Sequence, residues 1–154
     1  MKINYVKGDA TAPQGEGDKI ICHICNDIGV WGAGFVLAIT KKWGYPEYHY
    51  RARQQYPLGH VDVLSVDQDD NGNVLYVANM IGQHGVRSNA QGIPPIRYQA
   101  VAEALMKVNK IAKEMGATLH MPRIGCGLAG GEWSQIEKIL KAVVSVDVTV
   151  YDLN

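Results

Sequence analysis

Met121-Pro122-Arg123-Ile124-Gly125-Cys126-Gly127-Leu128-Ala129-Gly130 is the stretch of sequence that decides the fold. It follows a predicted short strand over 118–121 and precedes a predicted helix over 133–144. Its three glycines match the pattern G-x-G-x-x-G, in which the backbone approaches an anion and the following helix offers free N–H groups. We name residues 124–131 the second glycine loop and predict that it binds phosphate.

A similar loop lies earlier in the chain. Gly29-Val30-Trp31-Gly32-Ala33-Gly34, the first glycine loop, separates the apolar run 19–25 from a predicted helix over 35–43. The apolar run is short and nearly unbroken, which is typical of a strand buried on both faces of a parallel sheet. One such loop is often only a tight turn, but two loops at the carboxyl ends of parallel strands favour a ligand site. Together they predict a clamp on a diphosphate.

The remaining elements extend this α/β pattern. Asp69-Asp70-Asn71-Gly72 separates two apolar runs and predicts an antiparallel hairpin. The later half of the chain alternates strands and helices, which favours a three-layer α/β/α sandwich on a mixed, centrally parallel sheet. We expect one domain spanning residues 1–154. The other predicted elements are a strand over 3–6, a helix from Pro46 to about Tyr56, strands over 60–66 and 74–80, a loop over 82–95, a helix over 97–115 capped by Gly116, and a strand over 146–151.

Composition excludes several classes of protein. Apolar residues make up 47% and charged residues 19% of the 154 residues, which is unlike a disordered chain. Fifteen basic and fifteen acidic residues give zero net charge, so general nucleic-acid binding is not expected. No apolar run approaches the ~20 residues of a membrane span, and residues 1–9 contain no signal-peptide core. With three cysteines and no disulfide framework, the chain is predicted to be cytoplasmic.

Three motifs favour plainer interpretations. The acidic stretch from Asp67 resembles a calcium loop, but the twelfth place, where a glutamate is needed, is Ala78. Cys22 and Cys25 would point to opposite faces of a strand, so we expect no metal site. A dinucleotide oxidoreductase needs further strands after its glycine motif, and only one remains here. We therefore expect no cofactor.

Four segments carry a resemblance to a known family. They are Gly8-Asp9-Ala10-Thr11, Gly32-Ala33-Gly34, the run from Met121 to Leu128, and Val150-Tyr151. In this order and spacing, and over essentially the whole chain, the sequence resembles the macro domain family of ADP-ribose-binding modules. The most similar branch contains terminal ADP-ribose protein glycohydrolase and the ADP-ribose-1″-phosphate phosphatases.

The resemblance implies a role for each matching residue. Asp9 would accept a hydrogen bond from the adenine amine beside the Ala10 backbone, and Tyr151 and Asn154 would lie near the adenine. Asn26 would face the distal ribose. The diphosphate would lie between two sets of loop residues: Gly32, Ala33 and Gly34 in the first loop, and Ile124, Gly125, Cys126, Gly127 and Leu128 in the second.

The sequence departs from that branch where catalysis is concerned. The branch uses a lysine from the segment matching 81–84, which contains none here, and an aspartate where this chain has Ala129. The remaining candidates for catalysis are Asn26, Asp27 and His84, of which His84 suits general acid or base work near neutral pH. The expected partner is ADP-ribose or an ADP-ribosylated substrate. Two functions stay open: hydrolysis of an ADP-ribose derivative (a 1″-phosphate or an acyl- or protein-linked form), or binding of ADP-ribose without catalysis.

Overall fold

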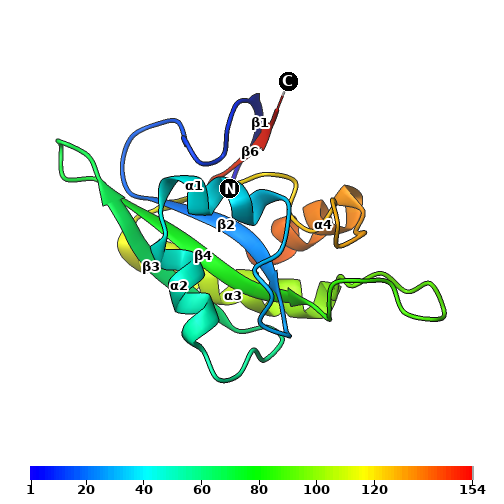
Figure 1. The fold of residues 1–154 in the computed structure, drawn as a ribbon. Helices are drawn as coiled ribbons and strands as arrows, with labels where there is room; N and C mark the ends of the chain where they lie inside the picture. The colour runs from blue at the N-terminus through cyan, green and yellow to red at the C-terminus, as the bar shows by residue number, and fades with distance from the viewer. Residues whose placement is uncertain (154) are drawn as a thin grey trace.

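A computed structural model describes residues 1–153, which form six strands and four helices (Figure 1). The sheet order is β1-β6-β5-β2-β4-β3. All neighbouring strands are parallel except β3 and β4, which form the predicted antiparallel hairpin. The elements are β1 (Ile3–Lys7), β2 (Lys19–Asn26), α1 (Phe35–Lys42), α2 (Tyr45–Ala52), β3 (Val61–Gln68), β4 (Val74–Gln83), α3 (Tyr98–Met115), β5 (Thr118–Met121), α4 (Trp133–Val143) and β6 (Val148–Asp152).

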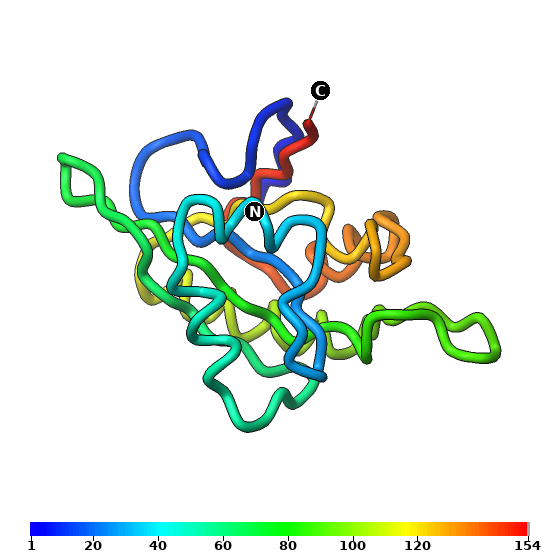
Figure 2. The backbone as a smooth tube through the Cα atoms, in the orientation of Figure 1, coloured from blue at the N-terminus to red at the C-terminus, as the bar shows by residue number. Residues whose placement is uncertain are grey.

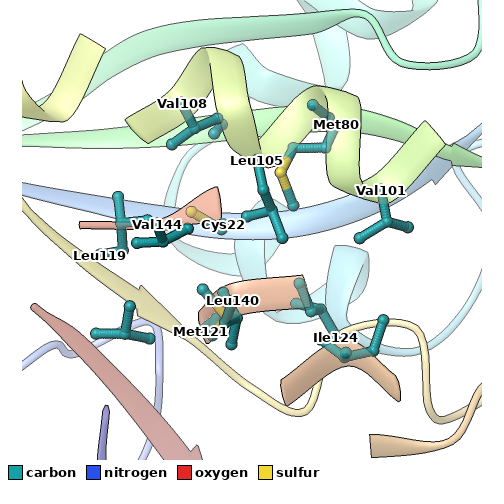
Figure 3. Packing of buried hydrophobic residues seen from close by; sticks show 14 of the residues in the cluster. Cys22, Met80, Val101, Leu105, Val108, Leu119, Met121, Ile124, Leu140 and Val144 are labelled. Carbon is teal, nitrogen blue, oxygen red and sulfur yellow. The ribbon is translucent and has the colours of Figure 1, made fainter. Parts of the chain in front are cut away.

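Helices cover both faces of this sheet, as a three-layer sandwich requires (Figure 1). One core joins the sheet to α3 and α4, and Figure 3 shows Cys22, Leu105 and Leu140 meeting there. The other core joins the sheet to α1 and α2 and contains Cys25 and Ile39. Because successive strand residues point to opposite faces, Cys22 and Cys25 lie in different cores, as predicted. The predicted fold class is confirmed.

Several predicted boundaries were wrong by a few residues. Helix α2 ends at Ala52 rather than near Tyr56, because the backbone becomes extended at Arg53 (φ −70°, ψ 148°). The Tyr56 hydroxyl then donates to the Tyr50 carbonyl (2.8 Å). Strand β6 begins at Val148 rather than at residue 146, because the Asn109 side chain binds the backbone N–H groups of residues 145 and 146. Strand β4 continues to Gln83, which shortens the predicted loop that follows.

Residues 84–95 form a loop that projects from the body of the protein (Figure 2). At its base the His84 N–H donates to the Pro95 carbonyl (2.8 Å), and a bridge joins Gln83 to Ile96. The base of this loop therefore lies at the carboxyl end of β4, beside the end of β2. No helix within residues 1–153 has the length and apolar character needed to cross a bilayer.

Candidate functional site

The two glycine loops face each other at the carboxyl edge of the sheet. The first glycine loop follows β2 and the second follows β5, and these two strands are parallel neighbours. A Cβ atom at Gly34 would lie 3.8 Å from Leu128 Cδ1, so the loops touch across the cleft. The predicted juxtaposition of the loops is thus present in the structure.

Two adjoining cavities occupy the space between the loops. The Arg123 cavity, of about 260 Å³, and the Asn26 cavity, of about 250 Å³, share the side chains of Gln83 and Leu128. Both also share Ile24, Ala33 and Val36. The Arg123 cavity is further lined by His23, Gly34, Phe35, Pro122, Arg123, Ile124, Gly125, Gly127 and Ala129, and the Asn26 cavity by Cys25, Asn26, Val30, Trp31, Gly32 and Val86.

Backbone N–H groups of both loops are available to a ligand. Within residues 1–153, no hydrogen bond uses the N–H groups of residues 32–34 or of residues 127–129. The first set leads directly into the N-terminus of α1, where the helix dipole also favours an anion. The cleft therefore presents anion-binding groups from two sides.

The glycines of the second glycine loop differ in whether the protein itself requires glycine at their position. Gly125 has a φ of +74°, and a Cβ atom there would collide with Ile96 Cδ1. A Cβ atom at Gly131 would lie 2.5 Å from the Gly125 carbonyl oxygen. At Gly127, by contrast, a Cβ atom would meet no atom of the protein within 4 Å. Gly125 and Gly131 are needed to close the loop, whereas only a ligand would require glycine at position 127.

Arg123 is a charged site residue to which the sequence assigned no role. Its guanidinium binds Asp152 through Nε (2.7 Å) and Nη2 (3.0 Å), and this hydrogen bonding raises its pKa. The same group lies over the rings of Tyr5 (5.2 Å) and Trp133 (5.4 Å). These contacts fix a cation at the edge of the Arg123 cavity. The sequence did contain a signal for this role, because Arg123 lies within the glycine motif that runs from Met121 to Gly130.

Gln83 is a second residue that sequence reasoning missed. Its side chain lines both cavities, and its Nε2 donates to the Gly85 carbonyl (3.0 Å). The residue lies at the carboxyl end of β4, which pairs with β2. The strand predicted from the sequence ends at residue 80, so the prediction could not place Gln83 at the edge of the sheet.

Asp9 lies at the carboxyl end of β1, outside the lining of both cavities. Its Oδ1 accepts hydrogen bonds from the backbone N–H (2.8 Å) and the hydroxyl (2.7 Å) of Thr11. The Thr11 N–H is the largest cause of the lowered pKa of Asp9. The carboxylate is exposed and fixed in orientation, while Ala10 is buried. A ligand extending from the cleft toward β1 would meet an ionised acceptor.

Tyr151 does not present an aromatic face to a base. Its side chain is only 3% exposed, and its hydroxyl lies 2.8 Å from both the Gln14 backbone nitrogen and His120 Nδ1. The expected stacking surface is therefore packed inside the protein in this structure. Asn154, the other residue expected near adenine, lies outside the described residues.

Asn26 lines the cavity that carries its name, but its amide shapes the first glycine loop. Its Oδ1 accepts from the backbone N–H groups of Ile28 and Val30 (3.1 Å each). Its Nδ2 donates to the Val30 carbonyl (2.6 Å). The Tyr50 hydroxyl lies 2.7 Å from the Asn26 carbonyl oxygen and 2.8 Å from Oδ1, which share its one proton. Asn26 thus acts first as the support of the loop.

Asp27 and His84 are brought together, although 57 residues separate them. Asp27 Oδ2 lies 2.7 Å from His84 Nδ1, and Oδ1 accepts from the Gly85 N–H (2.8 Å). Burial alone would raise the pKa of Asp27, but the hydrogen bonds from Gly85 and His84 outweigh it and hold the pKa below its usual value. The His84 side chain is 63% exposed. The pair lies beside Asn26 and Gln83, next to the Asn26 cavity.

Cys126 and Ala129 are the residues of the second glycine loop at which a nucleophile was considered. Cys126 is half-buried, its Sγ lies 3.4 Å from the Ile124 carbonyl, and burial raises its pKa. The thiol is therefore a poor source of thiolate. Ala129 is buried, and its carbonyl accepts from the Ile96 N–H (3.1 Å). Neither residue offers a nucleophile to a ligand in the cleft.

Fold and site together define an α/β domain in which two glycine loops frame a cleft at the carboxyl edge of a parallel sheet. No family model matches the chain. An ADP-ribose 1″-phosphate phosphatase of Meyerozyma guilliermondii is 31% identical, over 91% of this chain and 93% of that protein. The ADP-ribose glycohydrolase OARD1 of Bos taurus is also 31% identical, over 99% of this chain and 92% of that protein.

A solved structure agrees with these relatives. The macrodomain protein from Streptomyces coelicolor has a TM-score of 0.82 and 44% identity, over 98% of this chain and 99% of that one. The chain belongs to the macrodomain family. It spans only 16% and 14% of the length of two further curated relatives, the chromodomain-helicase-DNA-binding protein 1-like proteins of Mus musculus and Danio rerio.

Proposed function

We propose that the chain is a single macrodomain that binds ADP-ribose between its two glycine loops and hydrolyses an ADP-ribose derivative. The observation that carries this proposal is the pair of loops whose free N–H groups, at residues 32–34 and 127–129, face one cleft. A diphosphate suits such a cleft because each phosphate can accept hydrogen bonds from a different loop.

Each of the two cavities would take a different part of the rest of the ligand. The adenosine would extend from the Arg123 cavity toward the ends of β1 and β6, where the Asp9 carboxylate accepts the adenine amine. The distal ribose would enter the Asn26 cavity, whose lining includes the polar side chains of Asn26 and Gln83. The names of the phosphatase and glycohydrolase relatives support the same ligand.

The Asp27–His84 pair supports hydrolysis at the distal ribose. Because Asp27 is ionised, His84 Nδ1 donates its proton to Oδ2, which leaves Nε2 as the atom that accepts or releases a proton. Residues 81–84 contain no lysine, position 129 is alanine, and Cys126 is a poor nucleophile. We therefore propose that water attacks the phosphorus of a 1″-phosphate, or the acyl carbon of an ester, and that the bond from that atom to the ribose oxygen breaks. His84 Nε2 takes a proton from the attacking water and gives it to the departing ribose oxygen.

Binding without catalysis is the second candidate function. It is favoured by one observation: neither Asp27 nor His84 lines the cavities, and His84 is largely exposed. A solvated histidine at the edge of the site would leave the cleft a reader of ADP-ribose rather than an enzyme.

Two measurements separate these functions. Isothermal titration with ADP-ribose should show one site, with weaker binding of AMP, which lacks the distal phosphate and ribose. Incubation with ADP-ribose-1″-phosphate, and separately with a protein carrying ester-linked ADP-ribose, should release ADP-ribose from at least one substrate. Binding without product would select the binding module. No binding of ADP-ribose would overturn the proposal as a whole.

A further inference from the structure

A chain of hydrogen bonds that passes through two buried side chains links the sheet to the loop between β1 and β2. The backbone nitrogen of Gln14 lies 2.8 Å from the Tyr151 hydroxyl, which lies 2.8 Å from His120 Nδ1. On the other side of the ring, His120 Nε2 lies 2.7 Å from Thr118 Oγ1. Tyr151 is 3% and His120 2% exposed, so water does not supply these partners.

The direction of the bonds follows from the first donor and from the need of the buried hydroxyl proton for an acceptor. The Gln14 N–H can only donate, so the Tyr151 oxygen accepts from it. Among the described residues His120 Nδ1 is the one acceptor within reach of the Tyr151 hydroxyl proton, so that proton goes to Nδ1. His120 Nε2 then carries the ring proton and donates it to Thr118 Oγ1. Burial lowers the pKa of His120 to about 4, and nearby Lys19 acts in the same direction, so the ring is neutral near pH 7. Neutral imidazole is the form that this chain of bonds requires.

Tyr151 contacts the loop at two points that enclose Asp9. A Cβ atom at Gly8 would lie 3.5 Å from Tyr151 Cδ2, so the start of the loop packs against the ring. The hydroxyl then holds the backbone of Gln14. Residues 9–13 form the short span between these two contacts. The Tyr151 side chain thus fixes both ends of the segment that carries the Asp9 carboxylate.

We infer that Tyr151, oriented by His120, is a positioning residue that sets specificity for the adenine amine by holding the 9–13 segment. This inference rests on the proposed binding of ADP-ribose. It replaces a stacking role for Tyr151, because the ring is packed beneath the loop. His120 in β5 and Tyr151 in β6 would thereby control the hydrogen bond that Asp9, which follows β1, makes to the adenine amine.

The test compares two ligands that differ only at the N1–C6 edge of the base. Inosine diphosphate ribose carries a C6 carbonyl and an N1–H where ADP-ribose carries the amine and an acceptor N1, so it has no amine to donate to Asp9. We expect wild type to prefer ADP-ribose roughly ten-fold, since the Asp9 carboxylate meets a carbonyl oxygen instead of a donor in the inosine ligand. Tyr151→Phe, which keeps the ring and removes the hydroxyl, should lower that preference to about two-fold or less by weakening ADP-ribose alone. Exchange of the Gln14 amide proton, followed by NMR, should become faster in the same variant.

Matched variants separate positioning from general damage. Tyr98→Phe removes another hydroxyl that accepts a backbone N–H, that of Glu132 (3.0 Å), and should leave the preference unchanged. His120→Asn retains an acceptor near the Nδ1 position and should keep more of the preference than His120→Leu.

The outcomes that overturn the inference are distinct. If Tyr151→Phe weakens the binding of both ligands equally, Tyr151 has only a structural role. If the variant changes neither dissociation constant, Tyr151 has no role in binding. If wild type binds both ligands equally, Asp9 does not read the amine and the inference falls while ADP-ribose binding stands. If wild type binds neither ligand, the proposed function itself is wrong.

Discussion

Gly125 and Gly127 belong to one motif, yet alanine should destabilise the protein strongly at Gly125 and hardly at all at Gly127. At Gly125 the new Cβ atom would collide with Ile96 Cδ1 and lie 3.2 Å from Ile24 Cδ1. Such overpacking costs about 1–3 kcal/mol. The φ of +74° adds about 1–2 kcal/mol for a residue with a Cβ atom. Together these give a destabilisation of roughly 2–5 kcal/mol for Gly125→Ala. At Gly127 the space is open, so Gly127→Ala should change stability by less than about 0.5 kcal/mol.

Thermal unfolding and calorimetry check this contrast. For a chain of this length 1 kcal/mol shifts Tm by about 2–4 °C, so Gly125→Ala should lower Tm by roughly 4–20 °C and Gly127→Ala by under about 2 °C. Gly127→Glu should fold normally but lose ADP-ribose binding, because a carboxylate about 4 Å from a phosphate is repelled by about 4 kcal/mol at an effective dielectric constant of about 20. That corresponds to a roughly thousand-fold higher Kd. A wild-type Tm for Gly125→Ala, or a wild-type Kd for Gly127→Glu, would refute the reasoning.

Three further predictions concern single ionisable groups. Asp9→Ala should weaken ADP-ribose roughly ten-fold in a calorimetric titration, and an unchanged Kd would show that the amine is bound elsewhere. His84→Ala should slow hydrolysis by about 10²–10⁴-fold with little change in Kd, and Asp27→Asn should act in the same direction; full turnover in both would assign the proton transfer to another group. Burial lowers the pKa of His23 and of His120 to about 4, below the unfolded value of about 6.5. The unfolded chain therefore takes up protons first on acidification, so stability present above about pH 6.5 should fall by roughly 3 kcal/mol per histidine as the pH drops through about 4. Urea unfolding at a series of pH values measures this, and a flat profile would contradict it.

The sequence predicted the parts of the site that depend on local pattern. The apolar run of β2 and the glycines after it predicted a buried parallel strand leading into a ligand loop, since both signals lie within 16 residues. The hairpin between β3 and β4 was predicted for the same reason, from Asn71-Gly72 and the runs beside it. Helix α3 was predicted from the spacing of its apolar residues.

Contacts between distant segments could not be predicted in this way. Asp27 and His84 were each named as candidates, but their 2.7 Å contact depends on the pairing of β2 with β4. Tyr151 was placed near adenine by resemblance, and only the packed structure shows its ring beneath Gly8. Gln83 was missed because the end of β4 was set too early. In each case the deciding information is which strand ends lie next to each other.

The pairing of β1 with β6 has a consequence for how the protein folds. Ile3 pairs with Val148 and Lys7 with Asp152, so the first strand finds its partner only in the last one. Closing so long a loop of chain is entropically costly and slows folding, and during synthesis it must wait until residues 148–152 have been made. Asp9 directly follows β1, whereas both glycine loops are attached to strands nearer the middle of the sheet. We therefore expect refolding to restore the cleft between the glycine loops first and the edge that carries Asp9 last, when β1 pairs with β6.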